Sequence, residues 1–329
     1  MQEQATGGFM KNSHGARRAR RIVWAVDPFG VEYSIVRQTG RVVHAIAEQW
    51  GAQVQPLFLL GGFPSNVRRL PSLTRDIQTR AQRLVARVIP GMLPLRVLEA
   101  SDTRVRAGAE LLSEYALESG SSLIAVGTRA RKGLKRWYLG SFAETLILKS
   151  EVPLLVVNPN EQRRGKGGDR VEHILFPSDF SPESEAAYLK AVEFAREIGA
   201  RITLFHKVRF ELSPALEAAF RAYDSYRGLF REEVEGHQSK AEEWVEIAHR
   251  EGVEAESVID YRLGGSVMES VLRESKRRGG MIAIAARSGP VGSVLLGSVT
   301  RQLVRNAMVP VWVVHEEYRG LKGRIRRRA

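Results

Sequence analysis

The sequence predicts an α/β protein of two tandem, doubly wound domains, each a five-stranded parallel sheet with helices on both faces. Three observations support this prediction. The chain has 329 residues, which is enough for about two domains. Two pairs of segments recur at nearly equal distances along it. Short apolar runs alternate with segments of helical apolar spacing, and this alternation is typical of parallel sheets flanked by helices.

The internal repeat is visible at the start and at the end of each half. GSFAETLILKSEVPLLVV at residues 140–157 aligns without a gap with GSVTRQLVRNAMVPVWVV at residues 297–314, an offset of 297 − 140 = 157. Near the start of each half, RIVWAVD ends at Asp27 and HILFPSD ends at Asp179, an offset of 179 − 27 = 152. Two matches at nearly equal offsets indicate a duplicated domain.

The first repeat begins with an apolar run at residues 22–26, typical of a strand buried on both faces. Apolar residues then recur at helical spacing as far as Trp50, and Gly51 follows as a helix end. The same alternation continues through the repeat. The expected strands are 22–26, 54–60, 95–98, 123–126 and 154–157, and the expected helices are 31–50, 73–88, 105–117 and one that Gly140 opens.

The second repeat follows the same order of elements. Ser181 and Pro182 form a helix start, with a capping hydroxyl followed by proline at the first helical position. A long segment at residues 209–252 is mostly helical in pattern and is about twice as long as its counterpart in the first repeat. The expected strands are 173–177, 202–208, 258–260, 281–285 and 311–314.

Composition limits the class of protein. The chain has no cysteine, which excludes disulfides, thiolate zinc sites and thiol catalysis and fits a reducing compartment. No run approaches the roughly 18–20 apolar residues of a membrane span, and the N-terminus lacks the apolar region of a secretory signal. We therefore expect a cytoplasmic protein. The expected parts are a basic tail (1–19), a first domain (20–160), a linker (161–170), a second domain (171–316) and a basic tail (317–329).

The formal net charge of +13 is concentrated in three stretches, at residues 17–21, 163–170 and 319–328. Such stretches are either solvated chain ends or contacts for a phosphate-rich partner. Few aromatic residues interleave with these charges, as single-strand binding would favour, so we regard nucleic acid as the less favoured partner.

The candidate site lies where the sheet's winding reverses, beyond the carboxyl ends of the strands. Asp27 follows the first strand there, and a basic loop from Gly127 to Ser141 follows the fourth. Glycine lets backbone N–H groups approach an anion, and the helix that Gly140 opens favours negative charge at its start. The same pattern also fits a hydrated turn without a ligand. The sequence contains no P-loop, no Gly-x-Ser-x-Gly turn and no His-Glu-x-x-His metal motif.

The loop after the fourth strand resembles the universal stress protein signature G-x-x-G-(x9)-G-[S/T]. Gly127, Gly140 and Ser141 fit its spacing, and Ala130 stands where the second glycine belongs. The family's aspartate after the first strand matches Asp27, and PSDFSPES around Asp179 is close to the family's usual opening. The resemblance covers nearly the whole chain as two domains.

The resemblance implies a flavodoxin-like fold and, in some members, ATP binding. In the members that bind ATP, the aspartate and a residue at the end of the second strand hold the adenosine, and the glycine loop holds the phosphates. Mg²⁺ can accompany the nucleotide. Carried over to this chain, the binding residues are Asp27, a residue near Leu60, Gly127, Arg129, Ala130, Gly140 and Ser141.

The second repeat departs further from the family pattern. Ala285 replaces the first glycine, and the loop from Ala285 to Gly297 spans 297 − 285 = 12 steps, against 140 − 127 = 13 in the first repeat. Lys207 lies near the position where an apolar residue would contact adenine. We therefore expect the second site to be altered or lost.

The sequence leaves three functions open. The favoured one is a tandem universal stress protein that binds an adenine nucleotide in its first repeat and acts as a sensor or regulator, with at most slow ATP hydrolysis and no catalytic residues. The alternatives are a scaffold of the same fold that binds no nucleotide, and a nucleic-acid-associated protein that uses its basic tails. We also expect the two fifth strands to pair within the chain as a pseudo-dimer, with homodimerisation through another surface left open.

Overall fold

The computed structural model describes residues 19–29, 33–60, 71–100, 104–128, 141–158, 170–209, 231–286 and 297–315. Almost all of the two basic tails and of the expected linker lies outside these residues. So do most of the loop after each fourth strand and much of the long segment of the second repeat. The fold is therefore described from the secondary structure elements and the connections that join them within these ranges.

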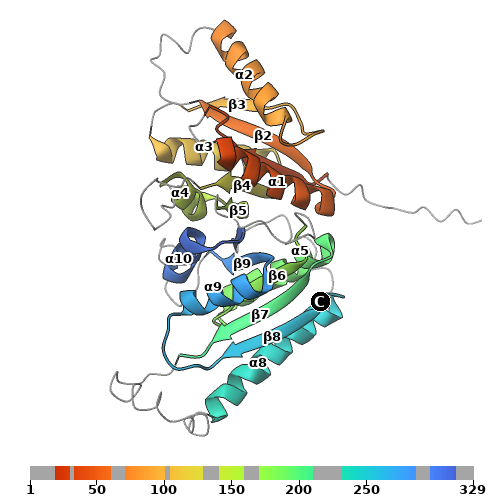
Figure 1. Ribbon diagram of the computed structural model, residues 1–329, viewed down its shortest axis with the longest axis vertical. Helices are drawn as coiled ribbons and strands as arrows, with labels where there is room; N and C mark the ends of the chain where they lie inside the picture. Colours follow the sequence, from red (N-terminus) through yellow and green to blue (C-terminus); the bar gives the residue numbers. More distant parts are fainter. Residues whose placement is uncertain are drawn as a thin grey trace, which may run out of the picture.

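The first domain contains the expected alternation of strands and helices (Figure 1). Only the bounds differ from those expected, by one to two residues. The elements in order are β1 (Arg21–Ala25), α1 (Tyr33–Trp50), β2 (Gln53–Leu60), α2 (Pro71–Ala86), β3 (Arg96–Glu99), α3 (Val105–Glu118), β4 (Leu123–Gly127), α4 (Ser141–Lys149) and β5 (Leu154–Val157).

The second domain repeats this order. Its third strand begins three residues earlier than expected, because polar residues continue the pairing with the neighbouring strand as far as Ala255. An edge strand tolerates such residues, since one of its sides has no strand partner. The elements are β6 (His173–Pro177), α5 (Pro182–Ile198), β7 (Arg201–Lys207), α8 (Arg231–Arg250), β8 (Ala255–Asp260), α9 (Val267–Arg278), β9 (Met281–Ala285), α10 (Ser298–Asn306) and β10 (Val311–Val314).

Capping explains where two helices of the second domain begin. The Ser181 side chain accepts a hydrogen bond from the backbone N–H of Ser184 at 3.2 Å, as expected for the start of α5. Ser266 and Glu269 form a reciprocal capping box at the start of α9. These local signals were readable in the sequence, because caps depend on residues only two or three positions apart.

The ten strands form one sheet in the order β3-β2-β1-β4-β5-β10-β9-β6-β7-β8. Each half is a five-stranded parallel sheet, as expected for the two tandem domains. The halves join through β5 and β10, which pair antiparallel with Trp312 opposite Leu155. The expected pairing of the fifth strands within one chain is therefore present. Because the order reads the same way outward from this junction, the two domains have approximate two-fold symmetry.

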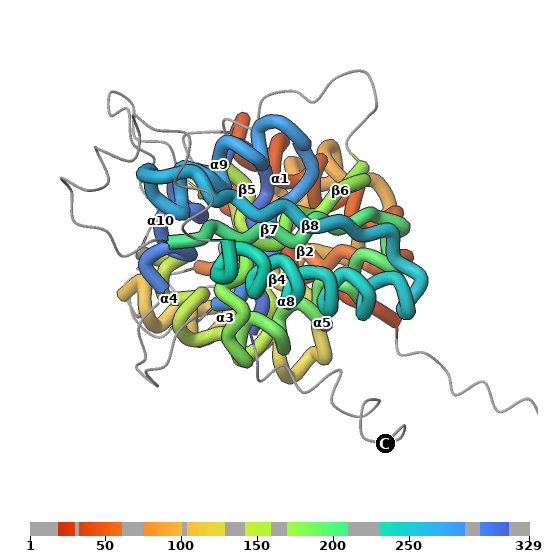
Figure 2. Tube along the Cα trace, turned by 90° about the horizontal axis from the view of Figure 1, so that it is seen from below, coloured from red at the N-terminus to blue at the C-terminus, as the bar shows by residue number. Residues whose placement is uncertain are grey.

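Helices cover both faces of the sheet, as Figure 2 shows along the row of strands. One hydrophobic cluster packs α1, α2, α5 and α8 against one face, and a second packs α3, α4, α9 and α10 against the other. The first cluster runs continuously from one domain into the other. The layering is that of a doubly wound sheet, in which both faces of the central strands are buried.

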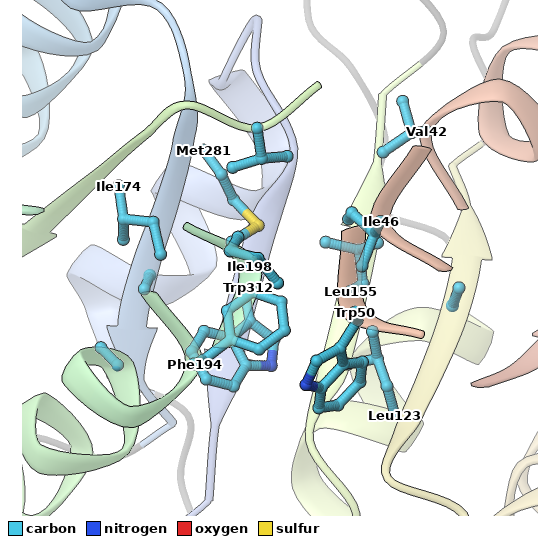
Figure 3. Packing of buried hydrophobic residues seen from close by; sticks show 14 of the residues in the cluster. Val42, Ile46, Trp50, Leu123, Leu155, Ile174, Phe194, Ile198, Met281 and Trp312 are labelled. Carbon is cyan, nitrogen blue, oxygen red and sulfur yellow. The ribbon is translucent and has the colours of Figure 1, made fainter. Parts of the chain in front are cut away.

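Aromatic rings close the junction between the domains (Figure 3). Phe194 in α5 lies between two tryptophans, with ring centroids 4.9 Å from Trp50 in α1 and 4.6 Å from Trp312 in β10. The indole N–H of Trp50 donates a hydrogen bond to Glu197 at 2.7 Å. The two domains thus share one hydrophobic core along this face, in addition to the β5–β10 ladder.

Candidate functional site

The carboxyl ends of β1, β2 and β4 meet at one edge of the first domain. β1 lies between the other two strands, and the winding reverses there because β2 and β3 extend to one side and β4 and β5 to the other. Asp27 follows β1 by two residues, Leu60 ends β2 and Gly127 ends β4. Three of the sequence-predicted residues are therefore placed at the switch point, the usual ligand position in a doubly wound sheet.

Asp27 shapes the turn that leaves β1. Its Oδ1 accepts a hydrogen bond from the backbone N–H of Phe29 at 3.2 Å, and the aspartate is half-buried. The Phe29 ring lies edge-on to Phe58 of β2, with centroids 5.5 Å apart and an interplanar angle of 70°. Leu60 lies on the same side of β2 as Phe58, because side chains two residues apart share a face. An aspartate, two aromatic rings and a leucine therefore gather around the end of β2.

Gly127 is required by helix packing. A Cβ atom at this position would lie 2.5 Å from Thr39 Oγ1 and 2.6 Å from Ile35 Cγ2, both in α1. Real Cβ atoms do not approach neighbours this closely, so α1 can cover the end of β4 only if this residue has no side chain. The glycine's presence is thus explained by packing, and by itself it does not mark a phosphate site.

The remaining predicted residues belong to the loop after β4. Arg129, Ala130 and Gly140 lie outside the described residues, and Ser141 is described only as the first residue of α4. The first turn of α4 carries Glu144, which would oppose an anion at the helix start. Glu144 is paired with Arg305 at 2.5 Å and Arg301 at 3.6 Å, both from α10 of the second domain. The start of α4 is therefore compatible with a negatively charged ligand.

In the second domain, the aspartate at the equivalent position serves the fold. Asp179 Oδ1 accepts hydrogen bonds from the backbone N–H of Ser181 at 3.1 Å and from its hydroxyl at 2.6 Å. Ser181 in turn caps α5. The carboxylate thus fixes the helix start, and this use competes with contacts to a ligand.

Aromatic and histidine side chains fill the space beside Asp179. Phe180 has an unusual positive φ of 58°, and its ring centroid lies 4.6 Å from His206 and 6.1 Å from His237, which is nearly parallel to it. Trp244 contacts the same ring edge-on at 5.3 Å. We call Phe180, His206, His237 and Trp244 the ring cluster. It joins the turn after β6 to β7 and α8.

Burial keeps the histidines of the ring cluster neutral. It lowers the pKa of His206 to about 4, although a hydrogen bond to the Ser178 carbonyl at 2.8 Å opposes the shift. Burial likewise lowers the pKa of His237. This cluster is not evident from the sequence, because its histidines are 31 residues apart and match no motif. The signal that could have revealed it is the ring repeated in the second strand, Phe58 in one domain and His206 in the other.

Lys207 lies one residue before the position equivalent to Leu60. In register, Ala25 pairs with Leu57 and Pro177 with Phe205, so Val208 is level with Leu60 and Lys207 is one residue earlier. The Lys207 side chain is only 4% exposed and its Nζ lies 3.7 Å from Asp260 Oδ1. Lys207 is therefore near the position equivalent to Leu60, as the sequence indicated, but on the opposite face of the strand, because adjacent residues of a strand point to opposite faces.

Asp260 is held by several cations at the end of β8. Arg262 donates to its Oδ1 at 2.9 Å and Arg273 to its Oδ2 at 3.3 Å. Burial would raise the pKa of Asp260, but hydrogen bonds from Arg262 and the charge of Lys207 outweigh it and hold the pKa at about 2. This cluster fixes the end of β8, which pairs with β7 at the outer side of the second domain.

Among the described residues, no group of three or more His, Cys, Asp or Glu side chains is arranged to hold a metal ion. None of the helices in the described part of the chain is long and apolar enough to cross a membrane.

Comparisons with known proteins relate both halves of the chain to one family. The model of the universal stress protein family matches residues 19–158 and again residues 170–315. A universal stress protein from Archaeoglobus fulgidus is 17% identical, with a TM-score of 0.60, and the match covers 91% of this chain and all of that one. No curated protein sequence matches significantly.

Two solved structures from Pseudomonas aeruginosa are also similar over 91% of this chain. A protein of unknown function is 14% identical with a TM-score of 0.52, over 93% of its length. A universal stress protein, so described provisionally, is 15% identical with a TM-score of 0.51, over 94% of its length. At these identities the structures show a shared fold, and the family is shown by the two matches along the sequence.

Proposed function

The chain belongs to the universal stress protein family, with one family domain in each half, and on this premise we propose that its first domain binds an adenine nucleotide, ATP or a close relative. Binding would make the protein a sensor or regulator that responds to nucleotide. The proposal treats the second domain as a structural partner that has lost its ligand site.

The proposal rests on a difference between the two domains at the turn that follows the first strand of each. In the first domain, the turn after β1 leaves the Phe29 ring 42% exposed beside Asp27 and Leu60. In the second, the turn after β6 packs Phe180 into the ring cluster. A planar ligand therefore has an accessible surface in one domain and meets the chain's own rings in the other.

The roles of the residues follow from their places at the switch point. Asp27 can accept hydrogen bonds from ribose hydroxyls or a base amine, and Leu60 can contact the base. Gly127, Arg129, Ala130, Gly140 and Ser141 would surround the phosphates at the start of α4, where Mg²⁺ can bind with them. Free backbone N–H groups at a helix start, together with the cation of Arg129, suit this charge.

We propose binding in preference to rapid hydrolysis. A general base needs a partner that orients it and tunes its pKa. Asp27 is oriented toward its own turn, where its Oδ1 accepts the Phe29 N–H. Any hydrolysis would then be slow compared with that of a dedicated ATPase, and the nucleotide would act mainly as a bound signal.

Calorimetric titration with ATP tests the proposal. We expect a stoichiometry near one per chain. Gly140→Asp places a carboxylate at the phosphate position and should weaken binding at least tenfold, about 1.4 kcal/mol. The matched control is Gly297→Asp, the same change at the equivalent position of the second domain, since 297 − 140 = 157 is the repeat offset. It should leave the affinity unchanged.

Three other outcomes of these titrations would contradict the proposal or favour another function. Two equivalent sites, or equal losses from both substitutions, would show that the second domain keeps its site. No binding of ATP or related nucleotides by the folded chain would refute the proposal and favour the scaffold alternative. Binding of an oligonucleotide that weakens steeply with salt would favour contacts through the basic tails.

A further inference from the structure

Phe29 lies next to the proposed nucleotide site and has no role in the binding described so far. We infer that the exposed face of its ring is the surface on which the base of the nucleotide stacks. This inference rests on the proposed function and adds to it a residue that recognises the base. It concerns an aromatic contact that the family signature does not contain.

The Phe29 ring is held in place from two directions. Its backbone N–H is bonded to the Asp27 carboxylate at 3.2 Å, which fixes the turn. Its ring meets Phe58 edge-on at 5.5 Å, which leaves a face of the ring for another planar group. A phenylalanine that is 42% exposed is among the most exposed large apolar side chains in the described part of the chain. The ring is thus pre-organised and accessible at the same time.

The second domain also places a ring of the turn after its first strand against a ring of its second strand. Because Leu57 and Phe205 occupy equivalent register positions, Phe58 corresponds to His206. Phe180, which aligns with Pro28 at the repeat offset of 152, lies tilted against His206 at 4.6 Å, whereas Phe29 lies edge-on to Phe58 at 5.5 Å. The His237 imidazole is nearly parallel to Phe180, with an interplanar angle of 18°. The second domain therefore places its own flat ring beside Phe180, whereas Phe29 in the first domain is 42% exposed.

Stacking suits a nucleotide base because every base has a π-face that an aromatic ring can cover. Base–aromatic stacking is worth ~1–3 kcal/mol per base, which corresponds to about 5- to 150-fold in affinity. Asp27 lies two residues away, within the same turn, where it can receive the sugar hydroxyls or the base amine. The ring and the carboxylate would together select a base with its ribose over a bare polyphosphate.

The experiment compares ATP with inorganic tripolyphosphate, which has no base, on the full-length chain. Phe29→Ala should weaken ATP binding at least fivefold and change tripolyphosphate binding less than twofold. Phe29→Trp should retain ATP binding within threefold, because it restores a flat ring. Leu117→Ala is the control, since Leu117 is an equally exposed apolar residue on α3, far along the chain from this turn. Circular dichroism and thermal unfolding establish that each variant is folded.

The results separate the two proposals. If Phe29→Ala binds ATP as tightly as the unmodified chain, the stacking inference is wrong, while nucleotide binding stands. If Phe29→Ala weakens ATP and tripolyphosphate equally, the ring supports the loop without touching the base, and the inference is again wrong. If the unmodified chain binds neither compound, the proposed function fails together with the inference.

Discussion

Burial controls the charge of single residues most clearly at His206. Its ring is 8% exposed, and its Nδ1 donates to the Ser178 carbonyl. Burial lowers its pKa to about 4, the neighbours His237 and Lys240 act in the same direction, and Asp179 opposes them. His173 in β6 is similarly buried and its pKa is also lowered to about 4. Both histidines are therefore neutral in the folded chain at pH values where an unfolded chain begins to bind protons.

This shift predicts acid sensitivity. The folded pKa lies below the unfolded value of about 6.5, so between about pH 6.5 and 4 the unfolded chain binds more protons than the folded one. The free energy of unfolding should therefore fall as the pH falls through this window. His206→Gln removes one of the groups that bind these protons. It should reduce the slope of the free energy of unfolding against pH by up to ~1.4 kcal/mol per pH unit.

Urea unfolding at several pH values between 7 and 4 measures this slope. The comparison uses the slope, because the substitution will also change the stability at neutral pH. His249→Gln is a control, since that histidine is exposed on α8. Parallel curves for His206→Gln and the unmodified chain would show that His206 takes up its proton without unfolding.

At the scale of elements, each fifth strand is followed by a residue that binds the last helix of the other domain. Asn158 after β5 donates to the carbonyls of Val304 at 3.2 Å and Ala307 at 2.7 Å, at the end of α10. His315 after β10 donates from Nε2 to the carbonyl of Ile147 in α4 at 2.8 Å. The contacts are equivalent, because 315 − 158 and 304 − 147 both equal the repeat offset of 157. Helix ends leave such carbonyls without intrahelical partners, so each domain completes a helix of the other.

Asn158→Ala should therefore weaken the junction. Asn158 is 2% exposed and also accepts the Thr128 hydroxyl at 2.5 Å, so its loss leaves several buried polar groups unsatisfied. We expect a loss of ~2–3 kcal/mol in the free energy of unfolding. Asn306→Ala is the matched control. The Asn306 amide donates a solvent-exposed hydrogen bond to the carbonyl of Gln302 within α10, and its loss should cost less than about 0.5 kcal/mol.

The measurement is urea unfolding of both variants, with hydrogen exchange of the β5 and β10 amides as a second readout. Exchange should accelerate at both strands in Asn158→Ala, since the residue joins them to α10. Equal stability of the two variants would show that water replaces the amide without cost and that the contact does not hold the domains.

At the scale of the whole molecule, β5 and β10 remove two apolar edges by pairing with each other. All four residues of each strand are buried, and an exposed edge of this kind would attract other chains. The ten-stranded sheet instead ends at β3 and β8, whose residues are partly exposed and include charged side chains. The tandem arrangement thus builds into one chain the contact that two separate domains would otherwise make.

The isolated first domain, residues 1–160, should therefore self-associate. Its β5 loses its partner, and a second copy offers the same apolar edge, which can pair antiparallel as β10 does. Sedimentation velocity over a range of concentrations measures this, with the full-length chain as the reference in which the edge is already covered. A folded first domain that stays monomeric throughout that range would contradict the prediction.

Much of the fold was predictable because its signals are local. The apolar run before Asp27 predicts β1, the period of 3.6 residues up to Trp50 predicts α1, and Ser181 with Pro182 predicts the start of α5. The position of Asp27 and Gly127 at the switch point follows from strand order alone. Arg129, Ala130 and Gly140 lie outside the described residues, so their part in the site remains a prediction.

The sequence by itself determined the duplication, the alternation of strands and helices, and the edge of the sheet at which a ligand would bind, because these depend on spacing and repetition along the chain. Only the tertiary structure decided that Gly127 makes room for α1, that the ring cluster fills the space beside Asp179, and that Asn158 and His315 bind across the junction. Those contacts join residues as far as 168 positions apart. No local pattern records such a pairing, because it arises from the packing of complete elements.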